Sequence, residues 1–232
     1  MRFGSPKSPL PAAGSSRWGE GRVRGGSRDK LTTMRRLAIT GGTGGLGTEV
    51  VRRLSLDYDC IVLGHAQVDL TNEDSVRKAF GDIGEIYGLV HLVGGWAGGT
   101  VRKTSLETWT NMLALNTTAA FLAARGALEH MTRPGRIVTV SSIATLDLEG
   151  GSAAYTVAKS ALNALVQILA AEERANGITA NAVLPDAMAT PAMLETTDAA
   201  KLVPLERVSE TIAFLLSDAA AGTSGTLIPI RA

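Results

Sequence analysis

Tyr155 and Lys159 are the residues whose types and spacing point most directly to chemistry. They stand four positions apart in a stretch that reads as a loop running into a long helix, so their side chains share one helical face. Because a nearby ammonium favours a phenolate, we expect the pKa of Tyr155 to fall below its ordinary value of about 10. A tyrosine with such a pKa can exchange a proton with a substrate oxygen near neutral pH. Taken alone, such a pair is more often an accident of a surface helix, and the rest of the chain decides between the two interpretations.

Two further polar side chains stand where they could act with this pair. Ser142 follows a predicted strand at residues 136–140, and a serine at the carboxyl end of a strand in an open α/β sheet faces the ligand crevice. Its hydroxyl could hold a substrate carbonyl there. Asn116 lies in an apolar stretch predicted to be helical, and a buried asparagine needs hydrogen-bond partners. We interpret it either as a structural bond or as part of a polar relay.

Histidine chemistry is not indicated. The chain contains three histidines, His65, His91 and His130, and none stands at a motif distance from a nucleophile, which argues against a hydrolase triad. No two of them have the spacing of metal ligands, so we expect no metal site. The single cysteine, Cys60, excludes an internal disulfide and fits a reducing compartment, which we expect to be the cytoplasm.

A cofactor site is indicated near the start of the folded part. Leu37–Thr40 reads as a short buried strand, the glycine-rich segment 41–47 follows, and an amphipathic helix comes next. Glycine permits a tight turn and the close approach of a pyrophosphate, while the helix N-terminus supplies free N–H groups. The spacing is G-x-x-x-G-x-G rather than the more common G-x-G-x-x-G. Strand, turn and helix together predict a dinucleotide site, whereas the glycine cluster alone would be read as a plain loop.

The second predicted strand, Cys60–His65, bears on which dinucleotide binds. An NAD site usually places Asp or Glu at the end of this strand to hold the adenosine ribose, and here Gly64 or His65 takes that place. No arginine for a 2′-phosphate is evident either. Thr43 and His65 are then the candidate phosphate contacts, and the missing acid favours NADP over NAD. The chain runs almost directly into residues 68–71, so we expect the second crossover helix to be missing or vestigial.

The remaining elements complete an alternating pattern. A strand at 89–93 ends in the glycine-rich stretch 94–99, where a cofactor could lie against the backbone, and Trp96 is there either a pocket wall or a packed loop anchor. Thr104–Glu107 has the form of a capping box that opens a helical region through Met131, broken into two. We also expect a helix at 72–80, a strand at 178–184, a loop at 185–205 that covers the substrate, a helix at 209–217 and a strand at 226–230. This alternation predicts the α/β class, as a single doubly wound Rossmann-type domain with a parallel sheet of six to seven strands.

Composition divides the chain into two parts. Of its 232 residues, 1–34 include seven Lys or Arg and two Asp or Glu, whereas 35–232 include sixteen and twenty. The first part is rich in Gly, Ser, Pro and Arg without helical or strand period, so we expect a disordered extension at 1–34, with Met34 as the natural start. The second part is the expected NAD(P)-binding domain. Its mild acidity does not suggest nucleic-acid binding, and no apolar run of 18 residues predicts a membrane helix.

Four landmarks stand in order along the folded part: the Thr40–Gly47 glycine motif, Asn116, Ser142 and the Tyr155–Lys159 pair. Together they resemble the short-chain dehydrogenase/reductase family over residues 35–232. The resemblance implies a Rossmann-type domain that binds NAD(H) or NADP(H). It implies that Ser142 orients the substrate carbonyl and that Tyr155 donates the proton. It also implies that Lys159 lowers the tyrosine pKa and binds the nicotinamide ribose, and that Asn116 holds a relay water.

The resemblance also supplies the candidate cofactor contacts, which are Gly41, Thr43, Gly44, Gly45, Leu46, His65, Asp69, Leu70, Gly94, Tyr155, Lys159, Pro185 and Thr190. Two places depart from the family pattern: its Asn-Asn-Ala-Gly is here His91–Gly94, and its Pro-Gly after the sixth strand is Pro185–Asp186. Thr190 still matches the threonine that contacts the nicotinamide amide. The stretches 93–99 and 182–191 are similar to the quinonoid dihydropteridine reductase branch, although that branch lacks a counterpart of Ser142.

The resulting hypothesis is an NAD(P)-dependent oxidoreductase that transfers hydride between nicotinamide and a small carbonyl, alcohol or imine, with Tyr155 as proton donor or acceptor. The main alternative is a non-catalytic NAD(P)-binding sensor or scaffold protein of the same fold. An isomerase or epimerase that uses bound NAD transiently ranks below both. The expected partners are a small-molecule substrate and further copies of this chain in a homo-dimer or homo-tetramer, because the helices at 111–131 and 155–176 are rich in apolar and small residues. Neither nucleic acid nor a membrane is an expected partner.

Overall fold

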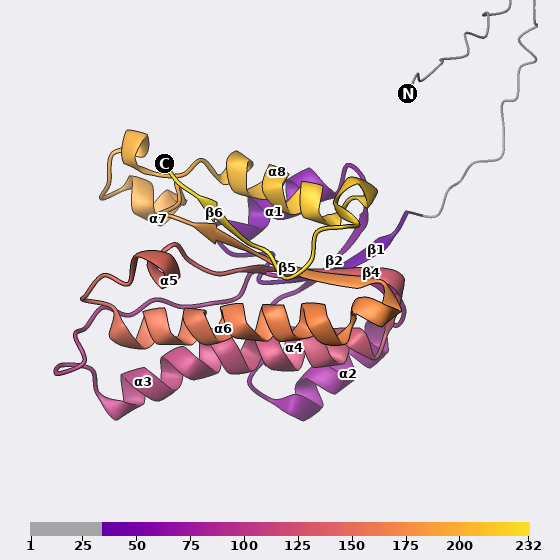
Figure 1. Cartoon of the computed structure of the whole chain (residues 1–232), viewed down its shortest axis with the longest axis horizontal. Helices are drawn as coiled ribbons and strands as arrows, with labels where there is room; N and C mark the ends of the chain where they lie inside the picture. The colour runs from indigo at the N-terminus through magenta and orange to yellow at the C-terminus, as the bar shows by residue number, and fades with distance from the viewer. Residues whose placement is uncertain (1–33) are drawn as a thin grey trace, which may run out of the picture. The chain divides into compact units, whose positions relative to one another are not determined.

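Residues 34–232 are described by the structure, a computed structural model (Figure 1). The expected disordered extension was residues 1–34; all of it except Met34 lies outside this range. The described part contains one sheet whose strands are β1 Arg36–Thr40, β2 Asp59–Leu63, β3 Ile86–His91, β4 Met131–Val140, β5 Ile178–Pro185 and β6 Leu227–Ile230. All neighbouring strands pair in parallel. Every residue of β3 and β5 is buried, as expected for central strands that are covered on both faces.

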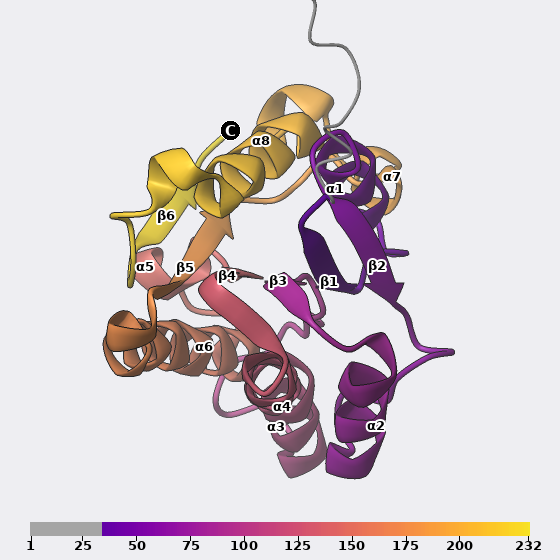
Figure 2. The same cartoon turned by 90° about the vertical axis from the view of Figure 1, so that its right-hand side faces the viewer.

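Helices cover both faces of this sheet. Figures 1 and 2 show α1 and α8 on one face and α2, α4 and α6 on the other, while the short α5 and α7 lie beyond the carboxyl ends of the strands. The helical elements are α1 Gly47–Leu54, α2 Glu73–Ile83, α3 Leu106–Leu113, η1 Ala114–Thr118, α4 Ala119–Leu128, α5 Ala144–Asp147, α6 Ala153–Glu172, η2 Arg174–Asn176, α7 Pro191–Leu194, η3 Ala199–Lys201, α8 Leu205–Leu216 and η4 Asp218–Ala220. Two large apolar clusters form most of the core, one on each face of the sheet, and a third, small cluster consists of Met112, Ala154 and Ala158. None of the helices within residues 34–232 is long and apolar enough to span a membrane.

The strand order creates a crevice beside β1. The order is β2-β1-β3-β4-β5-β6, so the chain moves to one side of β1 for β2 and to the other side for β3 and all later strands. In open α/β sheets, ligands bind outside the carboxyl ends of the strands where the order reverses in this way. Thr40 ends β1 and His91 ends β3, and the two are register partners. The ligand crevice is therefore expected just beyond them.

The predicted architecture is confirmed: one α/β domain with a parallel, six-stranded sheet flanked by helices. As predicted, no helix lies between the end of β2 and residues 68–71; α2, which begins after them, is the helix that connects β2 with β3. Asn72 caps α2, and its Oδ1 accepts a hydrogen bond from the backbone N–H of Ser75 at 2.9 Å. This cap explains why the helix begins where the sequence predicted it.

Three local predictions were wrong. The cap of α3 is Ser105, whose hydroxyl accepts from the backbone N–H of Thr108, and not a box formed by Thr104 and Glu107. The region after this cap is not broken into two helices, because η1 is a π-helical turn that joins α3 to α4 without a break. Residues 185–205 are not a plain loop, since they contain α7, η3 and a parallel bridge between Met188 and Val203.

Candidate active site

Helix α6 carries Tyr155 and Lys159, and its first turn is fastened to the glycine-rich stretch that follows β3. The backbone N–H of Ala153 donates to the carbonyl of Gly99 at 3.0 Å, and the N–H of Gly99 donates to the carbonyl of Gly151 at 2.7 Å. Since this stretch and α6 are far apart in the sequence, these bonds hold two separate parts of the site in register. These bonds thereby fix the first turn of α6, which carries Tyr155 as its third residue.

Lys159 is buried deep in the site. Its side chain is only 5% exposed, and its Nζ donates a hydrogen bond to the carbonyl oxygen of Val140 at 2.8 Å. Val140 is the last residue of β4, so the ammonium lies over the carboxyl end of a central strand. Burial disfavours the charged amine and lowers the pKa of Lys159 to about 8.

Tyr155 does not have the lowered pKa that we expected from Lys159. Burial raises the pKa of the Tyr155 phenol, and a hydrogen bond with the hydroxyl of Ser142 opposes this rise only in part. The expectation was wrong because the phenol is largely removed from water, while the ammonium of Lys159 is engaged with a backbone carbonyl. The structure therefore presents Tyr155 as a neutral phenol that holds its proton at neutral pH.

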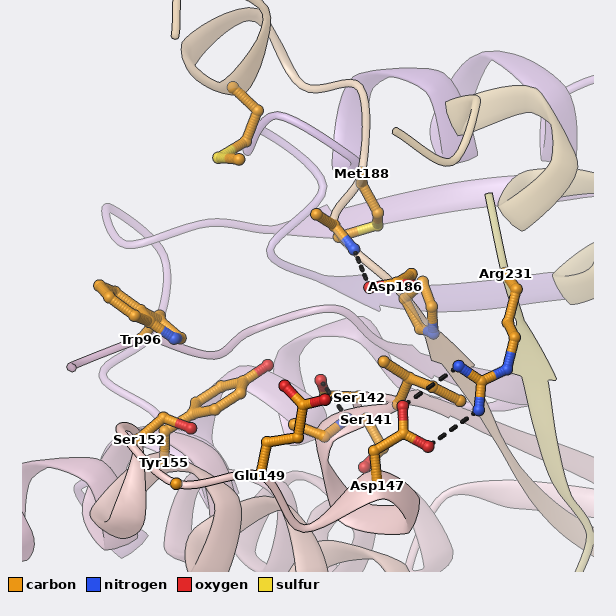
Figure 3. Close-up of a pocket in the computed structure, with 16 residues that line it drawn as sticks. Trp96, Ser141, Ser142, Asp147, Glu149, Ser152, Tyr155, Asp186, Met188 and Arg231 are labelled. Atoms are coloured by element: carbon orange, nitrogen blue, oxygen red, sulfur yellow. Dashed lines mark hydrogen bonds and ion pairs between the residues drawn. The ribbon is translucent and has the colours of Figure 1, made fainter. Parts of the chain in front are cut away.

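Ser142 and Tyr155 face a common cavity of about 770 Å³ (Figure 3). Ser142 lies two residues beyond β4, as predicted, and its Oγ accepts a hydrogen bond from the backbone N–H of Ala144 at 3.3 Å. Pro185, the last residue of β5, lines the same cavity. A carbonyl oxygen in this cavity has two hydroxyl donors within one wall, which is the arrangement needed to stabilise charge developing on that oxygen.

Asn116 is fully buried in η1 and acts first as a structural bond. Its Nδ2 donates to the carbonyl of Gly95 at 3.0 Å and to that of Met112 at 3.0 Å. Its Oδ1 accepts from the N–H of Gly95 at 3.2 Å. The amide thus fixes the backbone just after β3. Of the two interpretations that the sequence left open, these contacts support the structural one directly.

Gly94 connects Asn116 with Lys159. A Cβ atom at position 94 would lie 2.7 Å from Oδ1 of Asn116 and 2.9 Å from Nζ of Lys159. Only glycine leaves room for the amide and the ammonium to approach this backbone together. The four residues Asn116, Ser142, Tyr155 and Lys159, predicted from separate segments, therefore come together around the ends of β3 and β4.

A second cleft, of about 510 Å³, lies at the crevice between β1 and β3. Seven predicted cofactor contacts line it, namely Gly41, Thr43, Gly44, His65, Asp69, Leu70 and Gly94. Gly41 has a φ of 74°, a conformation that favours glycine. A Cβ at Gly45 would lie 3.1 Å from the side chain of Thr190, so the glycine-rich turn touches the segment after β5. The predicted Leu46 is different, because its side chain packs in the apolar core rather than in the cleft.

The end of β2 carries no carboxylate, as predicted. The backbone N–H of Gly64 donates to Oε1 of Gln67 at 3.0 Å, and His65 is exposed beside it. The carboxylate of Asp69 lies further along the same cleft. Its Oδ1 accepts from both the hydroxyl and the N–H of Thr71, at 2.7 and 2.9 Å, and these bonds lower the pKa of Asp69.

The 770 Å³ cavity is lined by Trp96, which the sequence singled out as either a pocket wall or a loop anchor, and by several residues that escaped prediction. Trp96 lines the 770 Å³ cavity and is 70% exposed, while its ring end touches Gly98, so it is both a pocket wall and a loop contact. Asp147, Glu149 and Arg231 also line this cavity. They belong to a short helix, a loop and the C-terminal end of the chain, none of which carries a motif. Only their proximity in the folded chain identifies them.

His91 is the other residue at the site that the sequence left without a role. It is fully buried, with Nδ1 2.9 Å from Oγ1 of Thr40, and its Nε2 has no partner among the described residues. Burial, together with the charge of Lys159, lowers the pKa of His91 to about 3. It is therefore a neutral imidazole in the layer below the site.

Comparison with known proteins gives a consistent result. A family model described as Enoyl-(Acyl carrier protein) reductase matches residues 36–231. The 3-oxoacyl-(acyl-carrier-protein) reductase MabA of Mycobacterium avium is 28% identical over 225 residues, which cover 84% of this chain and 88% of the relative. The inactive 2-(S)-hydroxypropyl-CoM dehydrogenase 2 of Xanthobacter autotrophicus is 33% identical over 186 residues, covering 70% and 80%. The crystal structure of an oxidoreductase of the short-chain dehydrogenase/reductase family from Burkholderia thailandensis matches with a TM-score of 0.78 and 28% identity, covering 85% of this chain and 91% of that one.

Proposed function

Because the chain belongs to the short-chain dehydrogenase/reductase family and is therefore an NAD(P)-dependent oxidoreductase, we propose that Tyr155 is the proton donor when its site reduces a small carbonyl or imine. The observation that carries the proposal is the shared cavity wall of Tyr155 and Ser142, with the buried ammonium of Lys159 one helical turn further along α6. This arrangement combines a proton donor, a second hydroxyl donor and a positive charge.

The chemistry follows from the state of each group. A bound nicotinamide would supply the hydride, and the carbonyl oxygen would then gain negative charge. Ser142 would hold that oxygen through its hydroxyl, and Tyr155 would give it a proton. The raised pKa of Tyr155 keeps the proton available for this step at neutral pH. Lys159 would stabilise the phenolate that is left behind, and in the reverse direction Tyr155 would accept the proton of an alcohol.

The described residues fit a dinucleotide. Gly41 and Gly44 line the cleft at the start of α1, where free backbone N–H groups can meet a pyrophosphate. Gly94 lines the same cleft and lies against Lys159, so this cleft continues towards the catalytic side chains. We propose that Gly45, Leu46, Pro185 and Thr190 complete the contacts, with Leu46 contributing only its backbone.

We further propose that NADP is preferred over NAD. The end of β2 offers Gly64 and His65 in place of the acid that would hold the ribose hydroxyls. Asp69 is the one carboxylate lining the cleft, and its Oδ1 is already engaged by Thr71. A 2′-phosphate at the end of β2 would therefore meet Thr43 and His65 rather than a carboxylate.

A homo-dimer or homo-tetramer is also proposed. Phe121 on α4 and Val157 and Ile168 on α6 are large apolar side chains with exposed fractions of 44%, 44% and 52%. Association of two copies through these helices would remove that surface from water. Light scattering of the purified protein coupled to size-exclusion chromatography gives the mass, and a monomer at micromolar concentration would contradict this proposal.

The non-catalytic sensor is the less favoured function. One relative is named as inactive, so the fold alone does not guarantee turnover. In this chain, however, all four proposed catalytic side chains are present. Ser142, Tyr155 and Lys159 meet around the ends of β3 and β4, and Asn116 supports them. This completeness supports catalysis over sensing.

Isotope transfer tests the proposed function. The protein is incubated with 4-deuterated NADPH or NADH and a panel of small aldehydes, ketones and imines that includes quinonoid dihydropterin. The expected result is deuterium on the reduced carbon of at least one product, in step with oxidation of the cofactor. Cofactor binding with no deuterium transfer to any member of the panel would favour the sensor.

A further inference from the structure

The charged side chains around the substrate cavity are unequally balanced. The lining contains three carboxylates, Asp147, Glu149 and Asp186, and a single cationic side chain, Arg231 (Figure 3). No other Lys or Arg of the described residues lines this cavity. The lining of this cavity therefore has an excess of negative charge. Arg231 is the cationic side chain that could bind a substrate anion here.

Arg231 is not free, because Asp147 holds it. Two guanidinium nitrogens of Arg231 donate to the two carboxylate oxygens of Asp147, at 2.9 and 3.1 Å. This is the bidentate geometry in which an arginine and a carboxylate satisfy each other. The backbone of Arg231 is also held, since its carbonyl accepts a hydrogen bond from Arg207 at 2.6 Å. An anionic substrate would therefore meet a guanidinium whose charge Asp147 already balances.

Two carboxylates are left without a cationic partner of their own. Glu149 has no hydrogen bond or ion pair with any residue in the range 34–232, and Figure 3 shows its side chain projecting between Tyr155 and Asp147. Asp186 is half-buried, and its Oδ1 accepts only the backbone N–H of Ala187, at 3.0 Å. Arg231 is near enough to Asp186 to feel its charge but is hydrogen-bonded to Asp147.

Asp186 is held at a defined place in the cavity wall. It follows the last residue of β5, and its backbone N–H donates to the carbonyl of Ile230 at 2.9 Å. Asp186 and Tyr155 both line this cavity, the first just after β5 and the second on α6.

The rest of the wall suits a cation with an apolar body. Trp96 is largely exposed at the rim, and the π face of an indole ring attracts cations. Met188 and Met193 add polarizable, adaptable apolar surface. A negative field from Glu149 and Asp186 combined with an aromatic ring attracts a positively charged or N–H-rich ligand, and it repels an anion.

We infer that the substrate of this enzyme carries a positive charge or several N–H donors close to its reducible C=O or C=N group, and that anionic carbonyl compounds are poor substrates. The inference rests on the proposed function, because it concerns the same cavity beside Tyr155. Glu149 and Asp186 are the residues that set this selectivity, and they act on the part of the substrate that does not react.

The test uses three ketones of matched size: one with a trimethylammonium group, one with a tert-butyl group in its place, and one with a carboxylate. With wild-type protein and NADPH, the expected kcat/KM of the ammonium ketone exceeds that of the neutral ketone by about tenfold at low salt, and the carboxylate ketone is slower by a similar factor. Added salt should reduce both ratios. Equal values for the three ketones, or a preference for the carboxylate, would overturn the inference.

Variants identify the residues responsible. Glu149→Gln and Asp186→Asn should each reduce the ratio of kcat/KM for the ammonium ketone to kcat/KM for the neutral ketone by several-fold. Each variant removes one negative charge that faces the substrate. Glu129→Gln removes the same charge from an exposed position that does not line the cavity, and it should leave the ratio unchanged. An equal effect of all three variants would attribute the selectivity to net charge and not to the cavity.

Calorimetric binding of the three corresponding alcohols separates this inference from the proposed function. The same ranking in affinity, measured without turnover, supports the charge selectivity even if no ketone is reduced. Absence of turnover with the ranking intact would contradict the proposed reaction only. Turnover without any ranking would contradict the charge selectivity only.

Discussion

The buried ammonium of Lys159 lies at the carboxyl end of β4, with Nζ 2.8 Å from the carbonyl oxygen of Val140. Only a backbone dipole, and no carboxylate, is hydrogen-bonded to this buried charge among the described residues. Burial therefore lowers its pKa from the ordinary value of 10.5 to about 8. A charge kept in an unfavourable place is typical of functional sites, where stability is given up for chemistry.

Lys159→Met should abolish turnover without lowering stability. Below pH 8, the buried charge costs on the order of a few kcal/mol, whereas its one hydrogen bond contributes about 1 kcal/mol. We expect the variant to be at least as stable as the wild type at pH 7 in urea unfolding, with turnover reduced by about a thousandfold.

Lys78→Met is the matched control, because Lys78 is an exposed lysine of α2 paired only with Asp82. Its turnover should be that of the wild type, and its stability should change by less than about 1 kcal/mol. A Lys159→Met variant that is markedly less stable than the wild type would show that the ammonium stabilises the fold.

Gly94→Ala should reduce turnover more than stability. The added methyl group would meet Oδ1 of Asn116 at 2.7 Å and Nζ of Lys159 at 2.9 Å. The Asn116 amide is held by its bonds to Gly95 and Met112, whereas Lys159 ends a flexible side chain, so the added methyl group should displace the ammonium and disturb the catalytic geometry more than the fold. A displacement of this kind costs about a hundredfold in rate, measured as kcat with saturating cofactor.

Gly81→Ala provides the comparison for this variant. Gly81 lies within α2, and a Cβ there would meet nothing within 4 Å. We expect unchanged turnover and a gain of roughly 0.5–1 kcal/mol from the better helix propensity of alanine. Wild-type turnover in Gly94→Ala would refute the close approach of Gly94 to the catalytic side chains.

His91 should make the fold sensitive to acid. Its pKa is lowered from 6.5 to about 3 in the folded chain, so between these values the unfolded chain binds a proton that the native chain does not. The contribution of the neutral imidazole to the free energy of unfolding is therefore fully present above pH 6.5. It falls as the pH drops, by up to about 1.4 kcal/mol per pH unit for one proton.

Urea unfolding between pH 5 and 7 measures how the free energy of unfolding changes with pH. This interval lies above the pH range in which most carboxylates titrate. His91→Asn should reduce the slope of this pH dependence, while His65→Asn, at an exposed position, should not. An unchanged slope in His91→Asn would show that other groups cause the acid sensitivity.

Cofactor preference should reverse when an acid is placed at the end of β2. In His65→Asp, the new carboxylate could accept hydrogen bonds from the ribose hydroxyls and would repel a 2′-phosphate. The ratio of kcat/KM for NADPH to that for NADH should fall by roughly tenfold or more. His65→Asn, which adds no charge, should have a smaller effect, and equal ratios in the wild type and His65→Asp would place the adenosine ribose elsewhere.

The sequence was sufficient to predict the sheet and to single out the proposed catalytic residues, because both depend on local signals. Buried strands appear as apolar runs, the glycine-rich turn follows the first of them, and Tyr155 and Lys159 have helical spacing. The absence of a helix directly after β2 was also readable, since too few residues separate β2 from residues 68–71. These features need no knowledge of distant contacts.

The parts that could not be predicted depend on burial and on contacts between distant segments. The pKa of Tyr155 rises because the fold excludes water from the phenol, and spacing to Lys159 carries no information about this. Asp147 and Arg231 form an ion pair between a short helix and the end of the chain. The π-helical turn at Asn116 adds a residue to one helical turn, for which residue propensities give no signal.

The most direct test of the account is Tyr155→Phe, which removes a single oxygen atom from the proposed proton donor. NADPH and NADH binding should stay within about twofold of the wild type, while turnover of any carbonyl that the wild type reduces should fall by about a thousandfold. Tyr58→Phe makes the same change in a buried ring that stacks on Tyr87 rather than lining the cavity, and it should keep wild-type turnover. Turnover of Tyr155→Phe within tenfold of the wild type, with cofactor still bound, would contradict the assignment of Tyr155 as the catalytic acid.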